Sequence, residues 1–219
     1  LHLSLRRQRQ MCIRDRYEDE LTVREAELAM LRRIGTTEHN MLNVQSNLAT
    51  TYASLGRYEQ ALQIERDLYS GRLKLHGEED PRTLQAALNY AASFVNLGRL
   101  KETKSLLRKV IPVAQRVFGE SHDNVLRMKW NYALALYKDA GATLDDCREA
   151  VTTLEDAQRA ARRVLGGAHP TTTGIVVALG KARAALRARE EARPRGAAII
   201  YAAAALAVAA VLVLRKKLT

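Results

Sequence analysis

The chain has 219 residues, of which 47% are apolar and 5% aromatic, with four prolines and a net charge of +11. This composition is that of a folded protein and favours helices over a sheet sandwich. The excess charge sits at the ends: residues 1–16 carry +4 and residues 187–219 carry +5, which leaves +2 for residues 17–186. A nucleic-acid-binding protein should carry a basic stripe on its folded body, so we predict no nucleic-acid partner. Cys12 and Cys147 lie in unrelated contexts and indicate a reducing compartment rather than a disulfide framework.

Residues 1–16 read LHLSLRRQRQMCIRDR and show no clean helical or strand period. One interpretation is a basic presequence, because Asp15 is the only acid. The other, which we favour, is translated adaptor sequence, which this stretch resembles. Similarity to the rest of the chain begins abruptly at Tyr17. We therefore predict that residues 1–16 are non-native or disordered.

A repeat of 42 residues organises the rest of the chain. Leu42, Asn47 and Ala49 return 42 residues later as leucine, asparagine and alanine, and return again after another 42. A fixed period in this range is the sequence signature of a stacked repeat array. The predicted units are a partial unit at 17–41, full units at 42–83, 84–125 and 126–172, and a partial unit at 173–191. The third full unit is five residues longer, with the insertion near 141–148. The half unit at 17–41 predicts further repeats upstream in the intact protein.

Each full unit is predicted to contain two helices. In the first unit an apolar stripe runs from about Leu42 to Leu55, and Gly56 follows it. Glycine tolerates the left-handed conformation of a helix C-cap, so the first helix should end there. A second helix should begin near Glu59 and end at residues 77–81, which read GEEDP.

The first unit also carries the pattern Asn47-Leu48-Ala49-x-x-Tyr52-x-x-x-Gly56-x-Tyr58-x-x-Ala61. This pattern resembles the tetratricopeptide repeat signature, and the 42-residue length resembles the kinesin light chain class of that family. The resemblance covers residues 17–186 and weakens after the first full unit. It implies an all-α fold, an α-solenoid of antiparallel helix pairs, in which the first helix of each pair lines a concave binding surface.

The candidate binding residues lie on those first helices. Asn47, Asn89 and Asn131 recur at the same repeat position, and an amide can hold the backbone of an extended peptide through a donor and an acceptor. Arg127 and Lys138 could accept an acidic side chain or a terminal carboxylate. Trp130 is the only tryptophan, a residue type enriched in binding hot spots. The alternative is that the asparagines merely cap or bridge helices. The histidines are interpreted as repeat-spaced structural residues rather than metal ligands: His39, His76, His122 and His169.

These features predict a non-enzymatic scaffold that binds a protein or peptide partner. The sequence shows no glycine-rich phosphate loop, no paired cysteine ligands and no nucleophile elbow. We therefore predict no catalytic site, no metal, no cofactor and no small-molecule substrate. The alternative is the regulatory or targeting repeat region of a larger enzyme whose catalytic domain lies upstream.

The end of the chain is predicted to be a membrane anchor. After a linker at 192–196, residues 197–214 read AAIIYAAAALAVAAVLVL, which is 18 residues without a charge, and a basic tail follows at 215–219. At about 1.5 Å per residue this helix would nearly span a hydrocarbon core of about 30 Å. A buried terminal helix of the folded body is the alternative. A single span this close to the end would insert after synthesis and leave the repeats in the cytosol, on the mitochondrial outer membrane or the endoplasmic reticulum.

Overall fold

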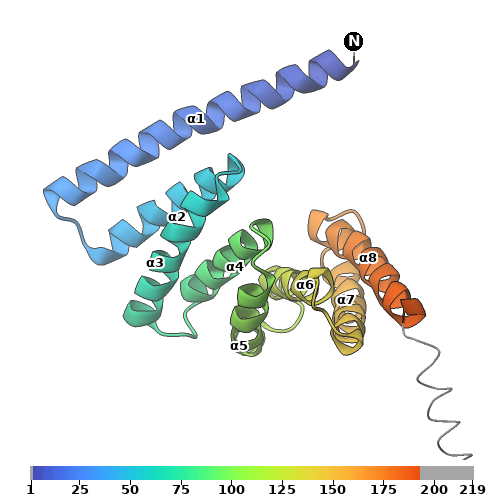
Figure 1. The fold of residues 1–219 in the computed structure, drawn as a ribbon. Coiled ribbons are helices and arrows are strands. Elements are labelled where there is room, and N and C mark those ends of the chain that lie inside the picture. The colour runs from blue at the N-terminus through green and yellow to red at the C-terminus, as the bar shows by residue number, and fades with distance from the viewer. Residues whose placement is uncertain (1, 193–219) are drawn as a thin grey trace, which may run out of the picture.

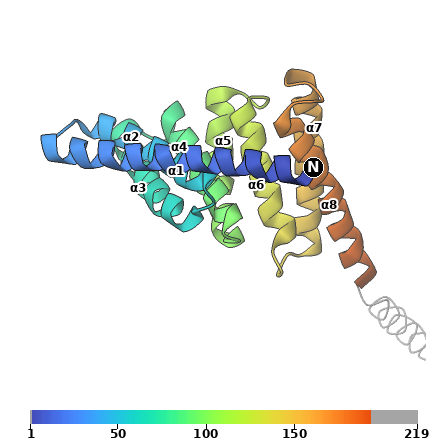
Figure 2. The same ribbon diagram turned by 90° about the horizontal axis from the view of Figure 1, so that it is seen from above.

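The computed structural model of the chain describes residues 2–192, which form eight helices. The helices are α1 (His2–Ile34), α2 (Glu38–Ser54), α3 (Tyr58–His76), α4 (Pro81–Asn96), α5 (Leu100–Phe118), α6 (Asp123–Lys138), α7 (Leu144–Val164) and α8 (Pro170–Ala192). Each packs antiparallel to the next, and the pairs follow one another in a single row from α2 to α8 (Figures 1 and 2). We call α2, α4, α6 and α8 the A-type helices and α1, α3, α5 and α7 the B-type helices. The predicted all-α solenoid of helix pairs is confirmed.

Helix ends are set by glycines and by polar caps, as the repeat pattern predicts. Gly56 adopts a φ of 74° and Gly98 a φ of 71°, the left-handed conformation that side chains disfavour. At the other end of the unit, the Asp80 side chain accepts from the backbone N–H groups of residues 82 and 83, and Pro81 occupies the first helical turn. The α4 helix therefore begins at Pro81, three residues before the predicted unit boundary at 84.

The array curves with its A-type helices on the inner side. The α4 and α6 helices pack directly against each other, and so do α6 and α8. No comparable contact joins two B-type helices within the described residues 2–192. Helices that are closer together on one side of a stack place that side on the inside of the curve. Helices α4, α6 and α8 therefore line the concave surface, and α2 continues the row without such a contact to α4.

The core runs continuously from α4 to α8 and includes fully buried residues of every helix in that span, such as Leu88, Leu107, Met128, Leu154 and Ile175. A separate apolar cluster joins α1, α2 and α3 through Leu21, Leu48 and Ala61. Neither cluster is closed by one helix pair alone, because each pair buries its apolar face against the next. The repeats are therefore one cooperative stack rather than independent domains.

The contact between the first and second full units is partly polar. The Arg72 side chain of α3 is buried, donates to the carbonyl of Arg82 at 2.9 Å and approaches the Asn43 side chain at 3.5 Å. Nearby, Glu65 is only 3% exposed and faces Ser93 of α4. Burial raises the pKa of Glu65 to about 7, an effect that the hydrogen bond from Ser93 partly opposes. This contact therefore holds a carboxyl group that resists ionisation.

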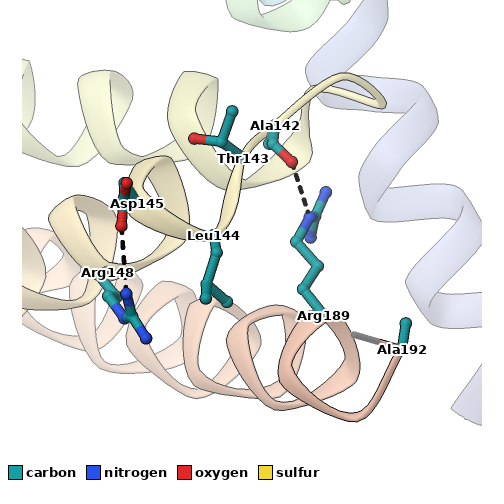
Figure 3. A pocket seen from close by; sticks show the side chains of 7 residues that line it. All are labelled: Ala142, Thr143, Leu144, Asp145, Arg148, Arg189 and Ala192. Carbon is teal, nitrogen blue, oxygen red and sulfur yellow. Dashed lines mark hydrogen bonds and ion pairs between the residues drawn. The ribbon is translucent and has the colours of Figure 1, made fainter. Parts of the chain in front are cut away.

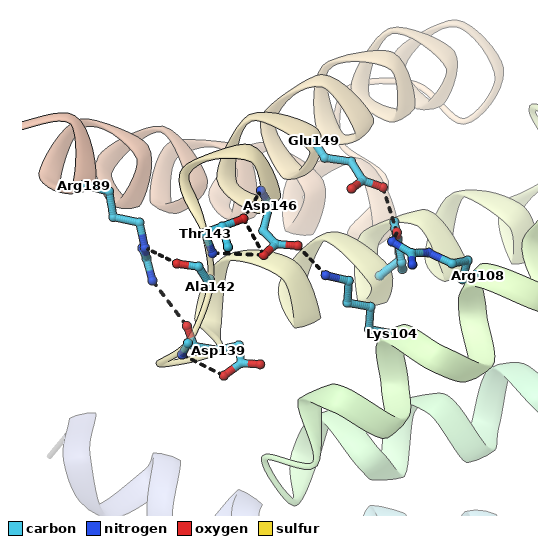
Figure 4. Close-up of polar contacts among 10 residues, drawn as sticks. Lys104, Arg108, Asp139, Ala142, Thr143, Asp146, Glu149 and Arg189 are labelled. Carbon is cyan, nitrogen blue, oxygen red and sulfur yellow. Dashed lines mark hydrogen bonds and ion pairs between the residues drawn. The ribbon is translucent and has the colours of Figure 1, made fainter. Parts of the chain in front are cut away.

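The second and third full units are joined by a polar network on the B-type side (Figure 4). Lys104 of α5 forms an ion pair with Asp146 of α7, 42 residues away. Asp146 also closes a capping box with Thr143 at the start of α7. The Lys104 ammonium, with the Thr143 backbone N–H, lowers the pKa of Asp146 to about 2. The network therefore fixes the start of α7 against α5.

The five-residue insertion of the third full unit is distributed over three places. The connection of residues 139–143 is two residues longer than its counterpart at 97–99. Helix α7 has 21 residues where α5 has 19, and the connection after α7 is one residue longer than the one after α5. Arg189 of α8 holds the longer connection by donating to the carbonyls of Ala142 and Asp139 at 3.0 and 3.3 Å (Figure 4).

Two of the predictions concern the ends of the chain. The stretch 1–16 was expected to be non-native or disordered, but from His2 onward the structure continues it as the first part of α1. The stretch is too polar and irregular to show an apolar helical period, and its non-native origin stays a prediction. The proposed membrane span at 197–214 lies outside the described residues. Among residues 2–192, no helix has the length and apolar character that a membrane span requires.

Replacing Glu65 with glutamine should remove a pH dependence of folding. The pKa of Glu65 is about 7 in the folded chain, against an ordinary value of 4.5. At low pH the carboxyl group is protonated in both the folded and the unfolded chain, so its burial then carries no cost of keeping it neutral. Its ionisation opposes folding increasingly as the pH rises through 4.5 to 7, by about 3 kcal/mol at pH 8.5. In urea unfolding, E65Q should therefore be more stable than the parent chain at pH 8.5 and nearly equal to it at pH 4.5. The exposed E59Q change in the same helix should leave the pH profile unaltered; a parallel profile for E65Q would contradict the burial argument.

Candidate peptide-binding surface

The three predicted asparagines lie on successive A-type helices at one repeat position. Asn47 of α2 is exposed, and Asn89 of α4 and Asn131 of α6 are half-buried. The residues that follow them share one repeat position: Leu48 and Tyr132 are buried, and Tyr90 is half-buried. The asparagines therefore lie beside the buried faces of their helices, and their place on the concave surface stays a prediction.

The amides have different local partners. Asn89 accepts from the Gln85 amide at 3.0 Å, a contact one turn along the same helix. The Asn47 backbone carbonyl accepts from Thr51, and the Asn47 side chain lies on the exposed face. Gln85 and Asn89 thus form a short amide pair at the centre of the array. Such a pair can exchange its internal hydrogen bond for one to a ligand backbone.

The surface has a basic bias. Helix α4 contains no acidic residue, and α6 contains only Asp123, whose carboxylate accepts from Thr171 of α8 at 2.7 Å. The half-buried Arg127 lies one turn before Asn131, and the exposed Lys138 lies at the end of the same helix. The positive groups here are therefore not neutralised by carboxylates on the same helix faces.

Trp130 has a packing role that the sequence did not reveal. Its ring lies over Gly174 of α8, so closely that a Cβ at that glycine would come within 2.2 Å of the indole Cη2. The indole also packs against the main core, and its N–H is buried without a hydrogen-bond partner. The Trp130 ring therefore connects α6 to α8, and its role as a binding hot spot stays a prediction. A single glycine on a neighbouring helix was the only sequence signal for this contact.

The four repeat-spaced histidines are structural, but not all are separated as expected. His122 and His169 accept from backbone N–H groups at the starts of α6 and α8, each at 3.2 Å. His39 and His76 were expected to lie one unit apart along a ridge, whereas their rings meet edge to face at 5.8 Å. Within residues 2–192, no three His, Cys, Asp or Glu side chains are grouped to hold a metal ion.

A hollow of about 570 Å³ lies beside the inserted connection and the end of α8 (Figure 3). Its charged groups are already engaged: Arg148 pairs with Asp145 at 3.2 Å, and Arg189 is bound to backbone carbonyls. The hollow therefore offers no free charged group comparable to Arg127 or Lys138.

Comparison with known proteins supports this assignment of the repeats. Residues 41–82 and 83–124 each match the tetratricopeptide repeat family, which confirms the 42-residue period. No curated protein matches the chain in sequence.

Solved structures of similar shape include a candidate kinesin light chain. A candidate kinesin light chain from Podosopora anserina, with nearly identical TPR-like repeats, aligns with a TM-score of 0.65 and 22% identity over 88% of this chain and 87% of its own. A single-residue variant of that same protein gives 0.66, with the same identity and coverage. BtubC (BKLC) from P. vanneervenii gives 0.63 at 17% identity over 85% of this chain and 74% of its own. At these identities the comparison establishes the fold alone.

Replacing Gly174 with alanine should displace the Trp130 ring. The added Cβ has no room beside the indole, so α6 and α8 must move apart or the ring must turn outward, at a cost of about 1–3 kcal/mol. Because Trp130 is the only tryptophan, its fluorescence reports the change directly. G174A should shift the emission to longer wavelength and lower the unfolding midpoint.

The matched control is Gly180 in the same helix, where an added Cβ meets no atom within 4 Å. G180A should leave the emission unchanged and raise stability by about 1 kcal/mol, because alanine is the better helix former. Unchanged emission in G174A would contradict the packing of Trp130 on α8.

Proposed function

We propose that this chain is a non-enzymatic scaffold whose concave surface binds an extended segment of a partner protein. The observation that supports this most directly is the curvature of the array, with its A-type helices on the inner side. Extended concave surfaces of this kind serve as binding surfaces in solenoid proteins. Tetratricopeptide repeats, matched over residues 41–124, are compatible with protein–protein interaction.

The amides would hold the backbone of the bound segment. Asn47, Asn89 and Asn131 occupy the same position in successive units, 42 residues apart. An amide donates to a carbonyl and accepts from an N–H, so a row of amides recognises an extended chain without specifying its side chains. Arg127 and Lys138 would add a preference for acidic side chains or a terminal carboxylate, because charge-assisted hydrogen bonds are stronger than neutral ones.

We also propose that residues 197–214 anchor the chain in a membrane, with the repeats in the cytosol. The support is the sequence alone: 18 uncharged residues followed by Arg215, Lys216 and Lys217. The length suits a thinner bilayer, as in the endoplasmic reticulum or the mitochondrial outer membrane. An anchored array would concentrate its partner at that surface.

Removing two amides should weaken binding without unfolding the array. A peptide selected from a displayed random library on the full chain serves as the probe, with its Kd measured by fluorescence anisotropy. N89A combined with N131A should raise Kd about 10-fold or more, because each lost hydrogen bond is worth about 0.5–1.5 kcal/mol. Circular dichroism should show unchanged helicity. Gln63 and Ser105 lie at one repeat position on B-type helices, and alanine at both should leave Kd unchanged; equal losses in the two double variants would refute the concave site.

The anchor is tested separately by alkaline carbonate extraction of microsomes after synthesis of the full chain in vitro. A spanning segment stays in the membrane pellet, whereas a peripheral protein is released. We expect the full chain to remain in the pellet and a variant lacking 197–214 to appear in the supernatant. Release of the full chain would remove the anchor without affecting the binding proposal.

A further inference from the structure

A second hollow, of about 370 Å³, lies where the connection between α5 and α6 meets α7. It is formed by the connection after Phe118, one side of α6 and the last two turns of α7. The lining residues are Glu120, Ser121, Lys129, Asp156, Arg159, Ala160 and Arg163. Inside it, the Arg163 guanidinium donates to the Ser121 hydroxyl at 3.2 Å.

The repeat register shows what Ser121 replaces. Ser121 lies two residues after Gly119, as Glu79 lies two residues after Gly77. Arg163 lies three residues before Gly166, as Arg116 lies three residues before Gly119. At the earlier junction, Glu79 and Arg116 form an ion pair at 3.1 Å. The Ser121–Arg163 contact is therefore the same inter-unit contact with a hydroxyl in place of the carboxylate.

The surroundings favour an anion at this hydroxyl. Three cationic side chains line the hollow, namely Lys129 from α6 and Arg159 and Arg163 from α7. Two carboxylates oppose them: Asp156 is paired with Arg159, and Glu120 is exposed beside Ser121. The Arg163 guanidinium is held by a neutral hydroxyl, so its charge is available to a further anion.

We propose that Ser121 is a phosphorylation site whose phosphate group this hollow binds. A serine/threonine kinase would transfer the γ-phosphoryl group of ATP to the Ser121 oxygen. The O–H bond is replaced by an O–P bond, ADP leaves, and the proton passes to the kinase base. Ser121 is half-buried on a connection between helices and has Glu120 before it and Asp123 two residues after it, so the kinase would be of an acid-directed class.

The phosphate would restore, with more charge, the acid that Glu79 supplies one unit earlier. A phosphoserine carries about 1.5 to 2 negative charges and three strong acceptor oxygens, enough to bind Arg163 in two contacts and to attract Lys129. The connection before α6 would then be tied to the end of α7. This proposal concerns the stiffness of the array and is independent of the proposed function of its concave surface.

The test places phosphoserine at position 121 of the full chain by genetic incorporation. Phosphoserine should raise the midpoint of thermal unfolding by about 2–4 °C, because each kcal/mol of added folding stability gives this shift in a chain of this size. By ³¹P NMR, the second phosphate pKa should fall below its ordinary value near 6, because Arg163 favours the dianion. R163Q should abolish both effects, and R163K should keep part of them.

Phosphoserine at Ser105, an exposed position on the outer side of α5, is the matched control and should show neither effect. Equal midpoints and equal phosphate pKa values at 121 and 105 would overturn the proposal. So would Arg163-dependent stabilisation of the unmodified chain by inorganic phosphate, because the hollow would then be a site for a free anion. Labelling of Ser121 by an acid-directed kinase with ATP, lost in S121A, would support it, and labelling confined to other residues would overturn it.

Discussion

Within residues 2–192 no helix pair completes its own core, and the remaining structure depends on that constraint. The apolar face of each pair is covered by the neighbouring pair. A side chain that makes a contact at one junction therefore has a counterpart at the same repeat position of the next junction. The ion pair between Glu79 and Arg116 and the contact between Ser121 and Arg163 occupy the same repeat positions at successive junctions. The repeat period therefore recurs in the contacts between units as well as in the sequence.

The same constraint produces the curvature. The A-type helices α4, α6 and α8 pack against one another, and the B-type helices are held apart and linked through long side chains such as Lys104 and Arg116. The Trp130 ring lies over Gly174, where a Cβ would have no room. This contact shows how closely α6 and α8 approach each other. At the first junction the buried polar side chains of Glu65 and Arg72 accompany a small apolar cluster of Leu42, Leu68 and Ala86, so stability along the array should be uneven.

Much of the fold could be predicted because the residues that end helices and pack between them recur in each repeat. Gly56 and Gly98 end A-type helices for the reason inferred from sequence, and Ala49 and Ala61 of the repeat signature are buried. Prediction failed where a residue's role depends on a neighbour far along the chain. Nothing local to Trp130 indicates Gly174, and nothing local to Ser121 indicates Arg163. The helix that begins at His2 was not expected for another reason: a helix whose sequence carries no apolar stripe offers no period to detect.

The central claim is that the A-type helices form the inner side of the curve. Double electron–electron resonance measures it directly in a chain with both native cysteines changed to serine. One variant carries spin labels at 47 and 131 on A-type helices, and the other carries them at 63 and 152, the corresponding span on B-type helices. The account predicts a clearly shorter separation for the inner pair. Equal separations, or a shorter outer pair, would contradict it.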